Sequence, residues 1–159
     1  MVLYQRQTVV DAPFERVWDF HSGISGLTAV TPDWMGLEVD AVIGETDDAA
    51  DDLRAGTRLE LSFKPLGLVP ASSWTALITA REVGTDSAWF RDEMIDGPFH
   101  HWVHTHRFTA VDGGTRIQDR VEYEIPAFNI LQLSGIAHPF FELVFRDRHR
   151  RTKALLENR

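Results

Sequence analysis

Residues 101–126 of the sequence read HWVHTHRFTAVDGGTRIQDRVEYEIP, and this stretch carries the strongest structural pattern in the chain. In its second half the odd positions 117–125 are largely apolar, whereas the even positions 116–124 are all polar. Alternate side chains of a β-strand share a face, so the odd positions are expected to point inward, with Asp119 among them. The segment VDGGT at 111–115 has the composition of a tight turn. The stretch therefore predicts a β-hairpin with one interior face.

The position of the turn sets which residues of the hairpin face each other. With the turn centred near Asp112 and Gly113, the opposing pairs are Asp119 with His106, Val121 with His104, and Tyr123 with Trp102. A shift of two residues would keep the same faces, but a shift of one would turn every apolar side chain outward. We therefore expect His104 and His106 to lie in the interior.

The preceding segment WFRDEMID, residues 89–96, is a third strand whose parity is less clear from the pattern. Phe90, Asp92 and Met94 form the more apolar of its two alternating sets. Pairing through the turn DGPF would then bring Asp92 close to His104. The sequence thus predicts an interior cluster of two carboxylates and two imidazoles on three neighbouring strands, formed by Asp92, Asp119, His104 and His106.

The remaining sequence predicts an α+β domain over residues 1–159. A first strand is followed by an amphipathic helix in 11–21 and by a second short helix that ends near Pro32. Strands are expected over 37–43, 57–64, 72–82, 88–95, 101–111 and 115–125, as in an antiparallel meander. Helical spacing then predicts a short piece over 129–137 and a long closing helix from Pro139, in which Glu142 is placed to pair with Arg146.

Composition excludes several classes of function. The chain has 159 residues, no cysteine and a net charge of −8, and its only lysines are Lys64 and Lys153. An acidic surface repels phosphates, so we expect no nucleic-acid partner. No run approaches the ~20 apolar residues of a membrane helix, and the N-terminus lacks the pattern of a signal peptide, so we expect a cytoplasmic protein without an integral membrane segment. The acidic, lysine-poor composition also suits a halophilic source, which stays a hypothesis.

The run from Phe90 to Pro126, flanked by APFERVWDF at 12–20 and FFELVFRDRH at 140–149, resembles the START-like or SRPBCC superfamily. Within it, the polyketide cyclase/dehydrase or coenzyme-Q-binding-like group is the most similar. The resemblance covers essentially the whole chain. It implies a helix-grip fold, in which a seven-stranded antiparallel sheet wraps round a long C-terminal helix and encloses a deep cavity for lipids, sterols, quinones, polyketides or hormones. Chemistry varies widely across the superfamily, so the fold does not fix the activity.

Residues expected to line the cavity are aromatic or flexible side chains on predicted inner faces. They are Trp74, Phe90, Met94, Trp102, Tyr123, Phe141 and Phe145. Aromatic residues at such spacing are also the ordinary content of a core, so the pattern alone leaves both roles open. Gly67 and Leu68, in the apolar loop PLGLVPASS at 65–73, are candidates for a gate at the cavity mouth, and the alternative is an ordinary turn.

Three interpretations of the His/Asp cluster remain open. In the first, each imidazole is held by a carboxylate in a buried structural network. In the second, His104 or His106 shuttles protons while Asp92 and Asp119 orient it. In the third, the cluster ligates a metal, but His104 and His106 lie two apart on one strand and no other ligand spacing occurs, so we expect neither a metal nor a cofactor.

The other histidines carry weaker signals. His100 and His101 lie near a turn and are expected to be exposed or at the rim of the cavity. His21, His138 and His149 are isolated in the sequence and are expected at surface or partly buried positions.

The function that these patterns favour is binding of a small hydrophobic ligand such as a lipid, a quinone or a polyketide, by a carrier or a sensor. The main alternative is a cyclase or dehydratase that uses the His/Asp cluster on a polyketide-like or aromatic substrate. A third class, a protein-interaction module, would have a filled interior and an apolar outer patch.

Overall fold

Seven antiparallel strands form one sheet, in the order β1-β7-β6-β5-β4-β3-β2, in the computed structural model, which describes residues 1–44, 52–67, 72–125 and 130–157. Of residues 130–135 only the backbone is described. The strands are β1 (Val2–Val10), β2 (Leu37–Ile43), β3 (Arg58–Phe63), β4 (Ser72–Val83), β5 (Ser87–Asp96), β6 (His101–Val111) and β7 (Gly114–Glu124). The helices are α1 (Phe14–His21), α2 (Ile24–Val30) and α3 (Ile130–Leu156), with short 3-10 turns at Asp33–Met35 and Pro65–Gly67.

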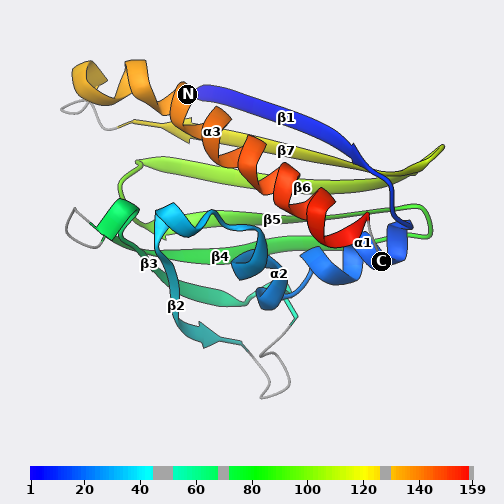
Figure 1. Cartoon of the computed structure of the whole chain (residues 1–159). Helices are drawn as coiled ribbons and strands as arrows, with labels where there is room; N and C mark the ends of the chain where they lie inside the picture. Colours follow the sequence, from blue (N-terminus) through cyan, green and yellow to red (C-terminus); the bar gives the residue numbers. More distant parts are fainter. Residues whose placement is uncertain (45–51, 68–71, 126–129, 158–159) are drawn as a thin grey trace.

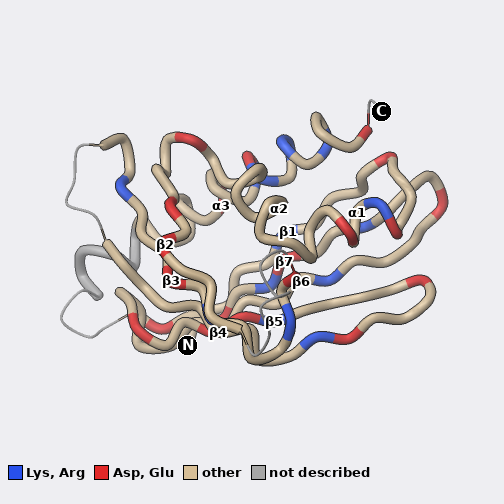
Figure 2. The backbone as a smooth tube through the Cα atoms, turned by 90° about the horizontal axis from the view of Figure 1, so that it is seen from below, with Lys and Arg blue, Asp and Glu red and all other residues tan. Residues whose placement is uncertain are grey.

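The sheet and the helices form two layers. Figure 1 shows α3 crossing one face of the sheet, with α1 and α2 beside its C-terminal end. In the view from below, the sheet curves round the side on which the helices lie (Figure 2). This is the helix-grip architecture that the sequence predicts.

The hairpin formed by β6 and β7 has the predicted register. His106 pairs with Asp119, His104 with Val121, and Trp102 with Tyr123. On the other side of β6, Asp92 of β5 lies directly opposite His104. Burial alternates along β7, with Asp119 4% exposed and Val121 fully buried, so the odd positions do point inward. The alternation of the sequence therefore sets the parity of the three strands that carry the His/Asp cluster.

Irregular pairing lets the sheet bend. The register between β4 and β5 shifts twice, between Thr75 and Ala76 and between Ile78 and Ala80, and that between β2 and β3 shifts once. An extra residue in one strand bends that strand and increases its twist. The β2–β4 half of the sheet can therefore curve away from the half that packs directly on α3.

Two apolar clusters lie between the layers. One joins α1 to the sheet and includes Val17, Trp18 and Phe108. The other joins α3 to β1 and β7 and includes Tyr4, Tyr123 and Phe141. The first cluster also includes Leu61 and Ile78, so it extends across the inner face of the sheet to β3 and β4.

Helix α3 differs from its prediction in two respects. It runs without interruption through Pro139, where the sequence favours two pieces. Proline removes one backbone hydrogen bond and bends a helix, and Figure 1 shows the orange N-terminal part of α3 at an angle to the rest. Glu142 also does not pair with Arg146. It binds Arg6 and accepts a 2.9 Å hydrogen bond from the Tyr4 hydroxyl, because it lies above the edge of β1.

Among the residues that the structure describes, no helix combines the length and the apolar character that crossing a bilayer requires.

Candidate functional site

A cavity of about 180 Å³ lies between the inner face of the sheet and the helices. Most of its wall is apolar, and strand periodicity explains which residues form it, since every second residue of each strand faces the helices. From β3 and β4 the wall receives Leu59, Leu61, Phe63, Trp74, Ala76 and Ile78. The opposite wall comes from α3 and α2, with Phe140, Phe141, Phe145 and Leu27.

Six of the seven residues predicted for the cavity wall lie in it: Trp74, Phe90, Met94, Trp102, Phe141 and Phe145. Tyr123 does not. It is 2% exposed and packs edge-on against Phe141, with ring centroids 4.9 Å apart. Helix α3 lies directly over β7, so this part of the inner face is core and leaves no space beside Tyr123.

The residues predicted for a gate fall only partly within the described chain. Gly67 ends the 3-10 turn Pro65–Gly67 with a φ of +65° and does not line the cavity. Its neighbour Leu66 is 69% exposed and also has a positive φ, +56°. Leu68 lies outside the described residues. A gating role for this loop stays a prediction.

Polar groups interrupt the apolar wall on one side. Those expected there are Asp92, His104 and His106, and the structure adds His21, Thr31 and Arg148. Helical spacing could have identified Arg148, because it follows Phe145 by three residues and Phe141 by seven on one face of α3. No comparable signal in the sequence marks Thr31, which lies just beyond α2.

Asp119 is the centre of a buried network of imidazoles. His104 Nε2 lies 2.9 Å and His106 Nδ1 lies 3.1 Å from Asp119 Oδ1. His149 Nε2 lies 2.6 Å from Asp119 Oδ2. Since a carboxylate only accepts hydrogen bonds, all three ring nitrogens that face Asp119 must carry protons. The network thus links β7, β6 and α3 through one side chain.

His149 corrects the expectation that it is isolated at a surface or partly buried position. It is 5% exposed and reaches Asp119 from α3. The sequence does not show this contact, because the rotation of α3 over the sheet decides which of its side chains meet β7. Its Nδ1 is buried without a hydrogen-bond partner among the described residues. A proton on Nε2 fits both observations.

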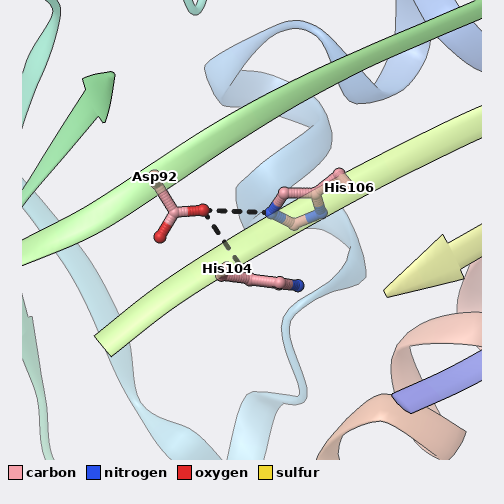
Figure 3. A group of neighbouring side chains, drawn as sticks. All are labelled: Asp92, His104 and His106. Carbon is pink, nitrogen blue, oxygen red and sulfur yellow. Dashed lines mark hydrogen bonds and ion pairs between the residues drawn. The ribbon is translucent and has the colours of Figure 1, made fainter. Parts of the chain in front are cut away.

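Asp92 faces the other edges of the two strand imidazoles. Its Oδ2 lies 3.1 Å from His106 Nε2 and 3.7 Å from His104 Nδ1 (Figure 3). The Trp102 indole also donates a hydrogen bond to Asp92. The two rings lie side by side, with centroids 3.7 Å apart. Both imidazoles are therefore enclosed between two carboxylates, Asp92 towards the cavity and Asp119 towards β7.

These contacts shift the pKa values of the carboxylate and the imidazoles in the network. Burial alone would raise the pKa of Asp119, but hydrogen bonds from three imidazoles hold it well below 3.8. Burial would lower the pKa of His106, but hydrogen bonds with Asp119 and Asp92 raise it above 6.5. Burial and the neighbouring His106 lower the pKa of His104. The two rings thus differ in proton affinity although they occupy adjacent inward positions of one strand.

His21 lines the cavity from the end of α1. Its ring shares a 3.3 Å hydrogen bond with the Thr152 hydroxyl of α3. Burial, helped by the nearby Arg148 charge, lowers its pKa from 6.5 to about 3. At neutral pH this ring is an uncharged polar group in the wall.

Replacing Asp119 tests how much the network contributes to the stability of the fold. Asp119→Asn leaves buried imidazole donors facing an amide, and losing one partner of a buried pair costs about 3 to 5 kcal/mol. We expect the free energy of unfolding in urea to fall by that amount. Asp33→Asn, at a side chain that is 91% exposed and binds Arg151, is the control and should leave the free energy of unfolding almost unchanged, because exposed ion pairs contribute little to stability. Equal losses in the two variants would contradict the assignment.

His21 predicts a pH dependence of stability. Its folded-state pKa of about 3 lies below the unfolded value of 6.5, so the unfolded chain binds the proton first and stability falls as the pH drops below 6.5. Between pH 7 and pH 5 this group alone should remove about 2 kcal/mol from the free energy of unfolding. His21→Gln should therefore lose about 2 kcal/mol less than the wild type over this interval in urea titrations. An identical pH dependence of the two proteins would show that His21 is not buried in its neutral form.

Comparison with solved structures places this architecture among known proteins. Protein CV1439 from Chromobacterium violaceum is 17% identical, with a TM-score of 0.70 and coverage of 99% of this chain and 98% of the other. Protein Ms6760 from Mycobacterium smegmatis is 20% identical, with a TM-score of 0.68 and coverage of 99% and 91%. Ara h 8.0201 is 13% identical, with a TM-score of 0.64 and coverage of 97% and 96%. At these identities the likeness shows the fold alone.

Sequence comparison gives the family. No curated protein matches the chain significantly. The family model described as "Polyketide cyclase / dehydrase and lipid transport" matches residues 10–153. Since this match spans most of the 159 residues, the chain belongs to the polyketide cyclase/dehydrase and lipid transport family.

Proposed function

We propose that the protein binds a small, largely apolar molecule in the cavity between the sheet and the helices, as a carrier or a sensor. The observation that carries this proposal is the cavity of about 180 Å³ with a mainly apolar wall. Each Å² of apolar ligand surface removed from water contributes about 25 cal/mol to binding, and a preformed cavity adds little reorganisation cost. The family's description, which includes lipid transport, agrees with this class of function.

The polar groups of the wall indicate that the ligand has one polar end. His21 and Arg148 lie close enough to influence each other's charge, and Arg148 also senses the Asp92 carboxylate, so these groups of the wall gather in one region. Apolar side chains of β3 and β4 form the rest of the wall. Pockets of this kind use a few polar groups to orient a ligand that binds mainly through its apolar body.

Arg148 indicates the charge of that polar end. Its Nη1 donates a 3.4 Å hydrogen bond to the Thr31 hydroxyl, and its guanidinium lies 5.9 Å from the centre of the Phe145 ring. Within the described residues, no carboxylate forms an ion pair with it. A guanidinium that faces a cavity pairs favourably with a carboxylate or another planar anion. We therefore propose that the ligand is a weak organic acid with an apolar body.

A second candidate function is acid–base catalysis on a bound polyketide-like or aromatic molecule. It is favoured by one observation, the position of His106 between two carboxylates in the cavity wall. In such an arrangement the carboxylates orient the imidazole that would exchange a proton with a substrate. The two candidates differ in the fate of the ligand, because a carrier releases it unchanged and a cyclase or dehydratase releases a product of altered structure.

Filling the cavity tests whether it is the binding site. Ala76 faces the cavity from β4, so Ala76→Phe should reduce the affinity for the neutral fluorescent probe N-phenylnaphthylamine by at least about tenfold, as expected for a loss of 1.4 kcal/mol or more. Ala154→Phe, at an exposed position of α3, is the matched control and should bind like the wild type. Circular dichroism verifies that both variants fold. Unchanged probe affinity in folded Ala76→Phe would exclude the cavity as the site.

Replacing Arg148 tests the acidic end of the ligand. In fluorescence titrations, Arg148→Met should weaken the binding of pyrenebutyric acid by about tenfold or more and leave the binding of its methyl ester almost unchanged, because a charge-assisted hydrogen bond contributes about 1.5 to 3 kcal/mol. Arg146→Met, at an exposed position of the same helix, should affect neither probe. If the acid and the ester lose affinity equally, Arg148 contributes packing and does not select for charge.

A further inference from the structure

Three atoms with lone pairs converge at the polar side of the cavity. They come from Asp92, His104 and His106, each of which offers one ligand atom within 4.8 Å of the other two. The atoms that face each other are Asp92 Oδ2, His106 Nε2 at 3.1 Å from it and His104 Nδ1 at 3.7 Å. Figure 3 shows them on the neighbouring strands β5 and β6, with Asp92 facing both rings. All three residues also line the cavity, so a small molecule or water could approach them.

Asp119 fixes which ring nitrogens carry protons. It accepts at Nε2 of His104 and at Nδ1 of His106, at 2.9 Å and 3.1 Å. In neutral rings the opposite nitrogens, His104 Nδ1 and His106 Nε2, then present lone pairs, and both face Asp92. Three electron-rich atoms in contact repel one another unless a positive species lies between them.

A proton satisfies this arrangement only in part. Placed on His106 Nε2, it completes the 3.1 Å contact with Asp92. His104 Nδ1 would still face the same oxygen at 3.7 Å without a hydrogen, beyond hydrogen-bonding distance. A divalent metal ion would use all three atoms. For metal–nitrogen bonds of about 2.0 to 2.1 Å, tetrahedral geometry separates neighbouring ligand atoms by about 3.3 Å. The observed separations of 3.1 Å and 3.7 Å lie on either side of that value.

The surroundings also match those of metal ligands. Histidine ligands commonly donate their second N–H to a carboxylate, which fixes the tautomer and the ring orientation, and Asp119 does this for both rings. Carboxylate ligands are themselves hydrogen-bonded, as Asp92 is by the Trp102 indole. His104 and His106 are two residues apart, and this spacing weighs against a metal site when the sequence is considered alone. In a β-strand, however, the same spacing places both rings on one face of β6.

We propose that His104 Nδ1, His106 Nε2 and the Asp92 carboxylate bind one divalent transition-metal ion, with Asp119 and Trp102 orienting the ligands and the remaining coordination positions open to the cavity. Two imidazoles and a carboxylate are ligands suited to Zn²⁺ or Fe²⁺. A metal here would replace the proton that otherwise lies between His106 and Asp92. The proposed metal site does not depend on the organic ligand proposed above.

The test is titration of untagged, chelator-treated protein with zinc chloride in a calorimeter. We expect binding of one ion per chain. Asp92→Ala should weaken the affinity by at least about 100-fold, and Asp119→Asn, which removes only an orienting group, by about 10- to 100-fold. His100→Ala is the matched control, because this histidine is exposed and should leave the affinity unchanged. The absence of stoichiometric binding by the wild type, or an unchanged affinity in Asp92→Ala, would overturn the proposal.

A measurement on the wild type covers the case in which the variants fail to fold. Co²⁺ is paramagnetic, so one bound ion should broaden the amide resonances around Asp92, His104 and His106 most strongly in NMR spectra. Broadening centred on the acidic segment ETDDAADD, residues 45–52, would instead show that the ion binds to that segment and would overturn the proposal.

Discussion

The carboxylate of Asp119 is the group on which the rest of this structure depends. It is 4% exposed and contacts three imidazoles, from two positions of β6 and one of α3. An isolated buried carboxylate costs several kcal/mol, so the fold requires all of its donors to be present at once. This requirement fixes the orientation of β6 and the rotation of α3 over the sheet. It also sets the tautomers of the rings that face the cavity.

The cavity follows from where α3 can pack. The contacts of its aromatic side chains with Tyr4 and Tyr123 place α3 over β1 and β7, at one side of the sheet. Helix α1 packs through Trp18 against Phe108 near the other end of the strands. The bulged strands β2 to β4 curve round the helices, and the apolar residues of β3 and β4 face a space that no helix fills. The fold thus combines a tightly packed edge, which contains the Asp119 network, with an open apolar half.

Local pattern was sufficient to predict the features that lie within the sheet. The alternation in 101–126 predicts which faces of β6 and β7 point inward, and the turn at 111–115 predicts their register. The pairing of Asp92 with His104 follows from the turn between β5 and β6. Features that depend on α3 could not be predicted in the same way. The position of His149 beside Asp119, the pairing of Glu142 with Arg6 and the exclusion of Tyr123 from the cavity wall all depend on how this helix is placed and rotated. Arg148 is an intermediate case. Its place on the same helical face as Phe141 and Phe145 could be predicted from the spacing, but its position in the cavity wall could not.

The direction of the protons in the network, which we expect to point at Asp119, can be observed directly. Long-range proton–nitrogen NMR correlations identify which nitrogen of each histidine ring carries hydrogen. At neutral pH we expect His104 to carry its proton on Nε2 and not on Nδ1, and His149 to carry a proton on Nε2, since their Nε2 atoms lie 2.9 Å and 2.6 Å from the Asp119 carboxylate. A spectrum in which either ring carries its proton only on Nδ1 would contradict this expectation.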